Sequence, residues 1–182
     1  MGGRQHGKCR RARKRRKPPP RHARITTMES KATLLGHPIH QMLIVFPLGL
    51  LGTSFIFDII QMLTHDPEWS HVAFYLIGAG VTGGAIAAVF GLIDFMGIPT
   101  GTRAKRVGKW HGLGNIIVVG LFGLSFFLRI PDPEAPSVIA LLLSLAGVAL
   151  ALFAGWLGGE LVNRLGIGVS DDANPDAPSS LG

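Results

Sequence analysis

The most informative absences in this 182-residue sequence concern charge and cysteine. Cys9 is the single cysteine, which excludes a disulfide framework and a cysteine metal cluster. Only 16% of the residues are charged, against roughly 25% in ordinary soluble domains. Eleven of the 18 Lys and Arg residues precede Met28, and no acid precedes Glu29. Residues 28–182 therefore carry 7 cations and 11 acids, a net charge of −4, which excludes a basic nucleic-acid-binding fold for this part.

Four long stretches lack Asp, Glu, Lys and Arg altogether. A membrane-spanning helix needs about 20 mainly apolar residues. The sequence predicts four such helices, at residues 42–63, 72–93, 112–130 and 138–157. A soluble bundle would give each helix a polar face, and residues 138–157 offer only Ser144 and glycine for one. The predicted fold is all-α, an integral membrane four-helix bundle.

The loops between these spans alternate in charge. Residues 64–70 and 131–136 contain acids and no cation, whereas residues 97–109 contain Arg103, Lys105, Arg106 and Lys109. Because Lys and Arg favour the cytoplasmic side, both termini are expected in the cytoplasm of an inner-membrane, multi-pass protein. We expect residues 1–30 to form a basic disordered tail, 31–169 the membrane domain, and 170–182 an acidic disordered tail. Met28 is an alternative start, in which case residues 1–27 would not be translated.

Helical rise sorts the polar residues of the spans into two layers. Because a helix rises about 1.5 Å per residue, His40 and Asp58 lie about 27 Å apart and cannot share a site. The inner layer is predicted to gather polar groups from every span: His37, His40, Asp94, His111, Asn115, Trp156, Glu160 and Asn163, with Arg103 and Arg106 beside them. The outer layer is expected to hold Asp58, His71 and His65, with Asp58 close enough to pair with His71.

Several short motifs resemble those of a bacterial membrane family, the domain of unknown function 2231. They are GHPIH, FPLG, a lone Asp ending the first span, GLIDF, His-x-x-x-Asn and GWLGGELV, spread over residues 34–169. The resemblance implies a four-helix integral membrane protein of undetermined activity. Some members are joined to a Rieske-type iron–sulfur domain, which implies redox work near the bilayer. The family's first motif usually reads His-Pro-x-His-Pro, and Gln41 replaces the second proline here.

Two cofactor hypotheses fit the inner layer. Haem b needs two axial imidazoles from facing helices and cations near its propionates, which His40 or His37, His111, Arg103 and Arg106 would supply. A non-haem zinc or iron centre would instead use His37, His40, Asp94, His111 and Glu160, with Asn115 and Asn163 supporting these ligands. Either centre would serve a redox partner protein in the membrane.

A third interpretation needs no cofactor. Polar groups at membrane depth are costly and usually pair with one another. In this interpretation the sole role of the cluster is to fix helix packing in a structural or interaction subunit. Asp94 would then bond His111 or pair with Arg103 or Arg106. Transport has less support, because no ionisable residue occupies the midplane and no inverted repeat is evident. The sequence contains no recognisable nucleophile–base pair and no phosphate-binding loop, so nothing in it indicates a stand-alone enzyme. The sequence leaves the oligomeric state open.

Overall fold

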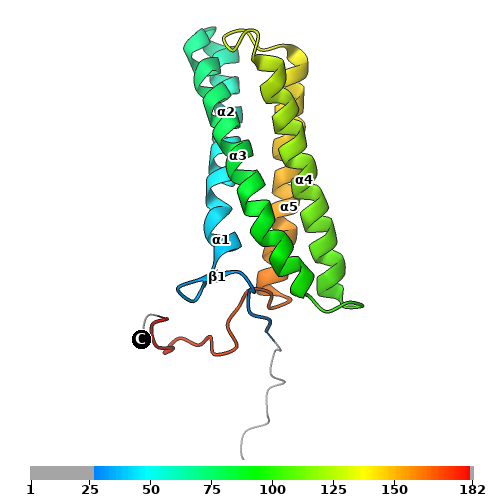
Figure 1. Cartoon of the computed structure of the whole chain (residues 1–182). Coiled ribbons are helices and arrows are strands. Elements are labelled where there is room, and N and C mark those ends of the chain that lie inside the picture. Colours follow the sequence, from blue (N-terminus) through cyan, green and yellow to red (C-terminus); the bar gives the residue numbers. More distant parts are fainter. Residues whose placement is uncertain (1–26, 181–182) are drawn as a thin grey trace, which may run out of the picture.

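The computed structural model describes residues 27–180 (Figure 1). A two-stranded hairpin of β1 (Thr33–Leu34) and β2 (His37–Pro38) precedes five helices. The helices are α1 (Ile39–Leu43), α2 (Val45–Thr64), α3 (Pro67–Gly97), α4 (Arg103–Arg129) and α5 (Val138–Asn163). Of the predicted basic tail at residues 1–30, residues 1–26 lie outside the described residues.

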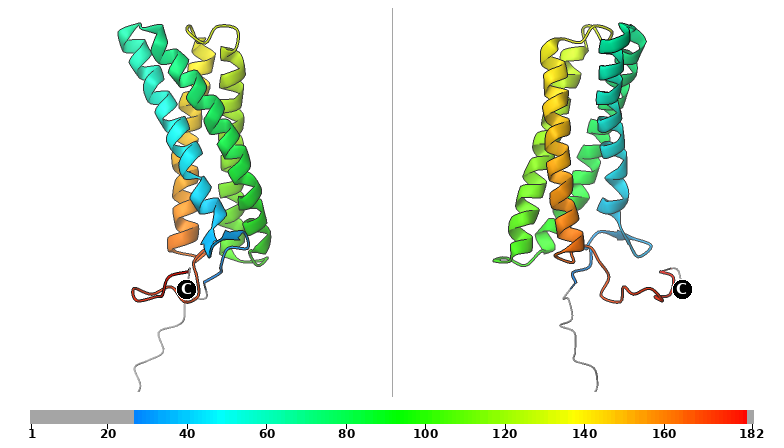
Figure 2. Two further views of the ribbon diagram at one scale, coloured as in Figure 1. Left: turned by 60° about the vertical axis from the view of Figure 1, so that its left-hand side comes forward. Right: turned by 180° about the vertical axis from the view of Figure 1, so that it is seen from behind.

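Four rods of membrane length stand side by side and antiparallel (Figures 1 and 2). Their apolar segments are Ile39–Thr64, Pro67–Gly97, Arg103–Arg129 and Val138–Asn163, each long enough to cross a bilayer. The all-α membrane bundle predicted from the sequence is therefore confirmed, although each helix is longer than its predicted span. Side chains such as Phe46, Val89 and Leu152 remain more than half exposed, as expected for a surface that faces lipid rather than water.

Local sequence signals explain where the rods begin and break. The side chains of Asp66, Thr102 and Ser137 accept hydrogen bonds from the first turns of α3, α4 and α5, as N-cap residues do. The first span is divided at Ile44, between α1 and α2. Pro47 lies three residues further on and has no backbone N–H for the carbonyl of Leu43, which explains the break.

Both described ends of the chain lie at one end of the bundle, which we name the terminal end (Figure 1). The opposite end, with the α2–α3 and α4–α5 connections, is named the loop end. At the terminal end, Met28 N donates to Gly166 O at 2.8 Å and Gly168 N donates to Met28 O at 2.7 Å. These two bonds join the chain that enters the first span to the segment that follows α5.

The bundle consists of two copies of one helical hairpin. The first hairpin is α1–α3 and the second is α4–α5. Residues 40–58 align with residues 111–129 at a constant offset of 71, which places GLLGTSFIFD opposite GLFGLSFFLR. The identical pairs in this stretch are His40 and His111, Gly49 and Gly120, Leu50 and Leu121, Gly52 and Gly123, Ser54 and Ser125, and Phe55 and Phe126.

The second helices of the two hairpins match in the same way. Residues 70–91 align with residues 137–158 at an offset of 67 (70 to 137). The identical pairs are Ser70 and Ser137, Ala73 and Ala140, Ala79 and Ala146, Gly80 and Gly147, Val81 and Val148, Ala87 and Ala154, and Gly91 and Gly158. Both hairpins run in the same direction, so the repeat is direct, with an approximate two-fold axis along the helices.

Equivalent close contacts hold each hairpin together. A Cβ atom placed on Gly80 would lie 2.6 Å from Leu51 Cδ2, and one on Gly147 would lie 2.6 Å from Phe122 Cε2. Leu51 and Phe122 are themselves equivalent, and they meet in the buried apolar core with Ile77 and Val118. Small residues therefore let the helices approach closely, which replaces the hydrophobic drive that is missing between helices in lipid.

Replacing Gly147 by alanine should destabilise the bundle by roughly 1–3 kcal/mol, because the new methyl group overlaps the ring of buried Phe122. The measurement is thermal unfolding of the detergent-solubilised protein. Gly120→Ala is the matched control, because nothing lies within 4 Å of its Cβ position. Equal melting temperatures for the two variants would contradict the packing described here.

Candidate functional site

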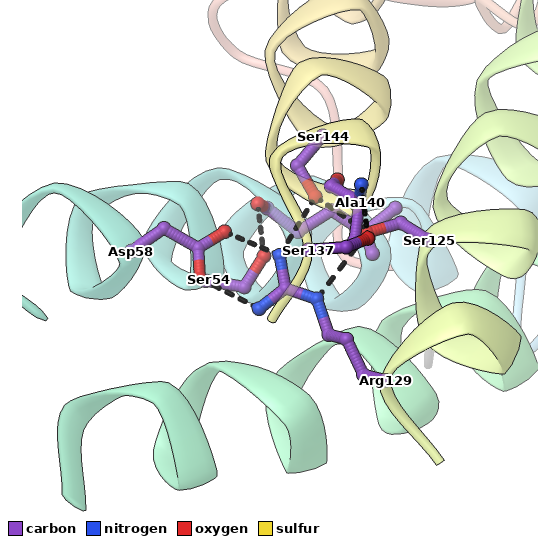
Figure 3. A network of polar contacts seen from close by, with 8 residues as sticks. Ser54, Asp58, Ser125, Arg129, Ser137, Ala140 and Ser144 are labelled. Carbon is purple, nitrogen blue, oxygen red and sulfur yellow. Dashed lines mark hydrogen bonds and ion pairs between the residues drawn. The ribbon is translucent and has the colours of Figure 1, made fainter. Parts of the chain in front are cut away.

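A buried ion pair joins the two hairpins near the loop end (Figure 3). Arg129 Nη1 donates to Asp58 Oδ1 and Arg129 Nη2 donates to Asp58 Oδ2, both at 2.7 Å. This bidentate arrangement is the strong geometry for a guanidinium and a carboxylate. The two side chains are 0% and 1% exposed, so the pair is removed from both water and lipid.

Serine hydroxyls complete the surroundings of Arg129. Its Nε donates to Ser125 Oγ and its Nη2 also contacts Ser144 Oγ, both at 3.3 Å (Figure 3). The two serine hydroxyls lie 2.9 Å apart, and Ser125 also donates to the carbonyl of Ala140 at 2.8 Å. Ser54, the equivalent of Ser125, is also fully buried and donates to Leu51 O. A charge kept from solvent is tolerated when its donors are matched in this way.

The expected pairing of Asp58 with His71 is wrong. His71 instead lies 3.7 Å from Glu134, on the connection between α4 and α5, and both side chains are well exposed. The sequence analysis did not predict a role for Arg129, because a cation at the end of an apolar stretch usually extends to the lipid headgroups. The repeat gives the missing signal: Arg129 is the residue that corresponds to Asp58.

Two histidines meet at the terminal end. The ring centroids of His40, on α1, and His111, on α4, are 6.4 Å apart, and the two ring planes are nearly perpendicular at 89°. These are equivalent positions of the repeat, so the rings approach each other across the approximate two-fold axis. The predicted gathering of His40 and His111 is therefore what the structure shows.

Each ring is held by the second helix of its own hairpin. His40 Nδ1 lies 2.9 Å from Ala87 O, and His111 Nδ1 lies 2.9 Å from Ala154 O. Because a carbonyl oxygen can only accept, Nδ1 carries a proton in both rings, and in the neutral form of each ring the lone pair is on Nε2. Metal-bound histidines show the same pattern, in which one ring nitrogen donates to a carbonyl and the other ring nitrogen binds the metal.

A glycine one turn beyond each of these carbonyls makes room for the ring. A Cβ atom on Gly91 would lie 2.8 Å from His40 Cε1, and one on Gly158 would lie 3.0 Å from His111 Cε1. Alanine at either position would therefore displace the imidazole. Each histidine thus has its own carbonyl partner and its own glycine, and these occupy equivalent positions in the two hairpins. The histidine pair is therefore part of the repeat.

Asn115 is the one predicted supporting amide that reaches this pair. Its Nδ2 donates to His111 O at 2.9 Å and lies 3.3 Å and 3.4 Å from the two ring nitrogens of His111. The amide of Asn115 therefore lies within hydrogen-bond distance of Nε2 as well as of Nδ1 of His111. Asn163 is exposed near the end of α5.

The other predicted members of the inner layer lie elsewhere. His37 is exposed on β2, with Nε2 3.2 Å from Ser180 Oγ, because the strand pairing of β1 and β2 turns it away from α1. Asp94 does not contact His111, Arg103 or Arg106 as expected. Its carboxylate instead accepts from Ser30 Oγ, Lys31 N and Ala32 N at 2.7–3.2 Å, which fastens the chain entering α1.

Glu160 is also engaged. Arg103 Nη2 donates to Glu160 Oε1 at 2.6 Å, which ties the start of α4 to the end of α5. Arg106 is exposed one turn further along α4. Within residues 27–180, no group of three His, Cys, Asp or Glu side chains is arranged to hold one ion. The five predicted ligands of a non-haem centre are thus dispersed, and the described site consists of two imidazoles.

The chain was compared with known protein families, curated proteins and solved structures. The family described as "Predicted membrane protein (DUF2231)" matches residues 36–171, a stretch that contains both hairpins and both polar sites. No curated protein and no solved structure matches the chain.

The energetics of the Asp58–Arg129 pair can be tested by a double-mutant cycle. Asp58→Leu or Arg129→Leu alone should each cost roughly 3–5 kcal/mol, because each leaves an uncompensated buried charge. The double variant, which removes both charges, should lose much less than the sum. Unfolding in detergent measures all three. Additive losses would show that the two residues do not interact.

Proposed function

Because the chain belongs to the DUF2231 family of predicted membrane proteins, and because His40 and His111 face each other across its bundle, we propose that it binds one haem between these histidines. In this proposal the protein is a multi-pass subunit of a bacterial inner membrane that passes electrons to or from a partner protein. It has no stand-alone enzymatic activity.

The distance between the two rings carries the proposal. An imidazole nitrogen binds a metal at about 2.0–2.1 Å, and the ring centre lies about 1.1 Å further away. Two axial imidazoles on one iron therefore have ring centroids about 6.3 Å apart. The 6.4 Å between His40 and His111 agrees with this value. Both Nδ1 atoms are bonded to carbonyls, so Nε2 is the nitrogen that would bind iron on each ring, and on His111 the amide of Asn115 would have to leave it.

The number of ligands favours haem over a bare ion. A zinc or iron ion bound by protein alone needs three or four side chains, whereas haem brings four equatorial nitrogens and needs two. Small residues of the flanking helices lie against the two rings: Gly91 and the carbonyl of Ala87 on α3, and Gly158 and the carbonyl of Ala154 on α5. Arg106, five residues before His111 and about 7.5 Å along the helix, supplies a cation for a propionate. Arg103 is a second such cation only if it leaves Glu160.

The proposal predicts that the purified full-length protein, made with a haem precursor in the medium, carries one haem per chain. His40→Ala or His111→Ala should abolish the low-spin absorption spectrum, because each removes an axial ligand. Perpendicular imidazole planes should also give the strongly anisotropic electron paramagnetic resonance signal of such ligation. Absorption and a pyridine haemochrome assay give the stoichiometry.

His71→Ala is the control, because His71 lies at the loop end and should leave the spectrum unchanged. A folded protein that stays colourless after haemin is added would overturn the proposal. The histidine pair would then be a packing element of a structural or interaction subunit.

The proposed orientation has both termini in the cytoplasm, because the 98–102 connection leads into four cations at the start of α4. In a Cys9→Ser background, Thr100→Cys should resist a membrane-impermeant maleimide in intact cells, whereas Ala135→Cys at the loop end should react. Both side chains are exposed, so access depends on the side of the membrane. The reverse labelling pattern would contradict this topology.

A further inference from the structure

The axis between the hairpins is lined by pairs of equivalent residues. His40 meets His111 at the terminal end, Leu51 and Phe122 share the core, and Asp58 meets Arg129 near the loop end. Contacts between equivalent positions are the mark of an isologous interface, here formed within one chain. The first two pairs are alike in chemistry. Only the third combines opposite charges.

This difference matters for partner choice. Two copies of the first hairpin would bring two Asp58 carboxylates into one buried site, and two copies of the second would bring two Arg129 guanidinium groups together. Like charges without water are strongly repelled, whereas the mixed pair is fully hydrogen-bonded. The histidine pair consists of two identical residues and the core pair of two apolar ones, so neither brings like charges together in any of the three combinations.

We propose that Asp58 and Arg129 are the residues that select the partner of each hairpin, so that the first hairpin binds the second and rejects a copy of itself. A single polar pair at an otherwise symmetric helix interface sets pairing in this way in coiled coils. The proposal is independent of any cofactor at the histidines, because it concerns the opposite end of the bundle.

The surroundings make a reversed pair feasible. Ser54 and Ser125 are equivalent and both fully buried, so each of the two positions has a hydroxyl one turn earlier on its own helix. Ser125 serves Arg129 now, and Ser54 is placed to serve an arginine at position 58. The second serine contact has no counterpart, because Ile77 corresponds to Ser144. A swapped pair should therefore be tolerated with some loss.

The test uses the full chain with Asp58→Arg, Arg129→Asp and the double swap. Each single variant places like charges in the buried site and should lower the yield of folded, monodisperse protein on the order of a hundredfold. The swap should restore most of that yield. Glu68→Arg is the matched control, since it makes the same charge change as Asp58→Arg at an exposed residue of the loop end and should have no effect.

Partner choice itself is read out by cutting the folded chain at a protease site introduced in the exposed turn at Thr100–Gly101. The halves of the wild-type chain, and those of the swapped chain, should each stay associated in mild detergent. When cut wild-type and swapped proteins carrying different tags are mixed, halves of different parents should not pair, because they carry like charges.

Three results would overturn the proposal. A swap no better folded than the single variants would show that the two positions are not interchangeable. Single variants as stable as the wild type would show that the pair does not govern association. Free exchange of halves between wild-type and swapped proteins would show that partner choice lies elsewhere in the interface.

Discussion

Lipid offers a protein interior no hydrophobic advantage, and the bundle is built around that constraint. Its helices are held by close contact at glycine and by hydrogen bonds that the bilayer cannot replace. Gly80 and Gly147 admit the large side chains of the neighbouring helices, and the Asp58–Arg129 pair satisfies two charges that would otherwise be prohibitively costly. The apolar core thus lies between two polar sites, the histidine pair at the terminal end and the Asp58–Arg129 pair near the loop end.

Duplication gives the polar ends their character. A group repeated in both hairpins is brought to face its own counterpart, so one histidine per hairpin becomes a pair with one geometry. Equivalent carbonyls and glycines support the two rings. Asn115 contacts His111 but has no counterpart at His40, because Ile44 occupies the corresponding position in the first hairpin. A ligand on the axis would therefore be held by two nearly identical arms and tuned by one asymmetric amide.

Sequence alone predicted the membrane helices well, because length and apolarity are properties of composition and do not depend on contacts. Depth along the helices correctly brought His40 and His111 to one layer. Depth says nothing about direction around a helix axis, which is why Asp94, Glu160 and His37 were expected at the same site and lie elsewhere. The carboxylate of Asp94 accepts hydrogen bonds from the backbone N–H groups of Lys31 and Ala32, and a pattern of side chains does not reveal backbone partners. The repeat was visible in GLLGTSF and GLFGLSF and would have identified Arg129, but only an alignment of the chain against itself finds it.

The contacts at the terminal end also differ in how much of the chain each of them requires. Asp94 and its partners Ser30, Lys31 and Ala32 all belong to the first hairpin or to the segment that enters it, so this contact needs no residue of the second hairpin. The backbone bridge between Met28 and Ile167 needs the segment that follows α5. A truncated chain that stopped between its hairpins would therefore contain both partners of the Asp94 contacts, but its Asp58 would have no Arg129 to pair with.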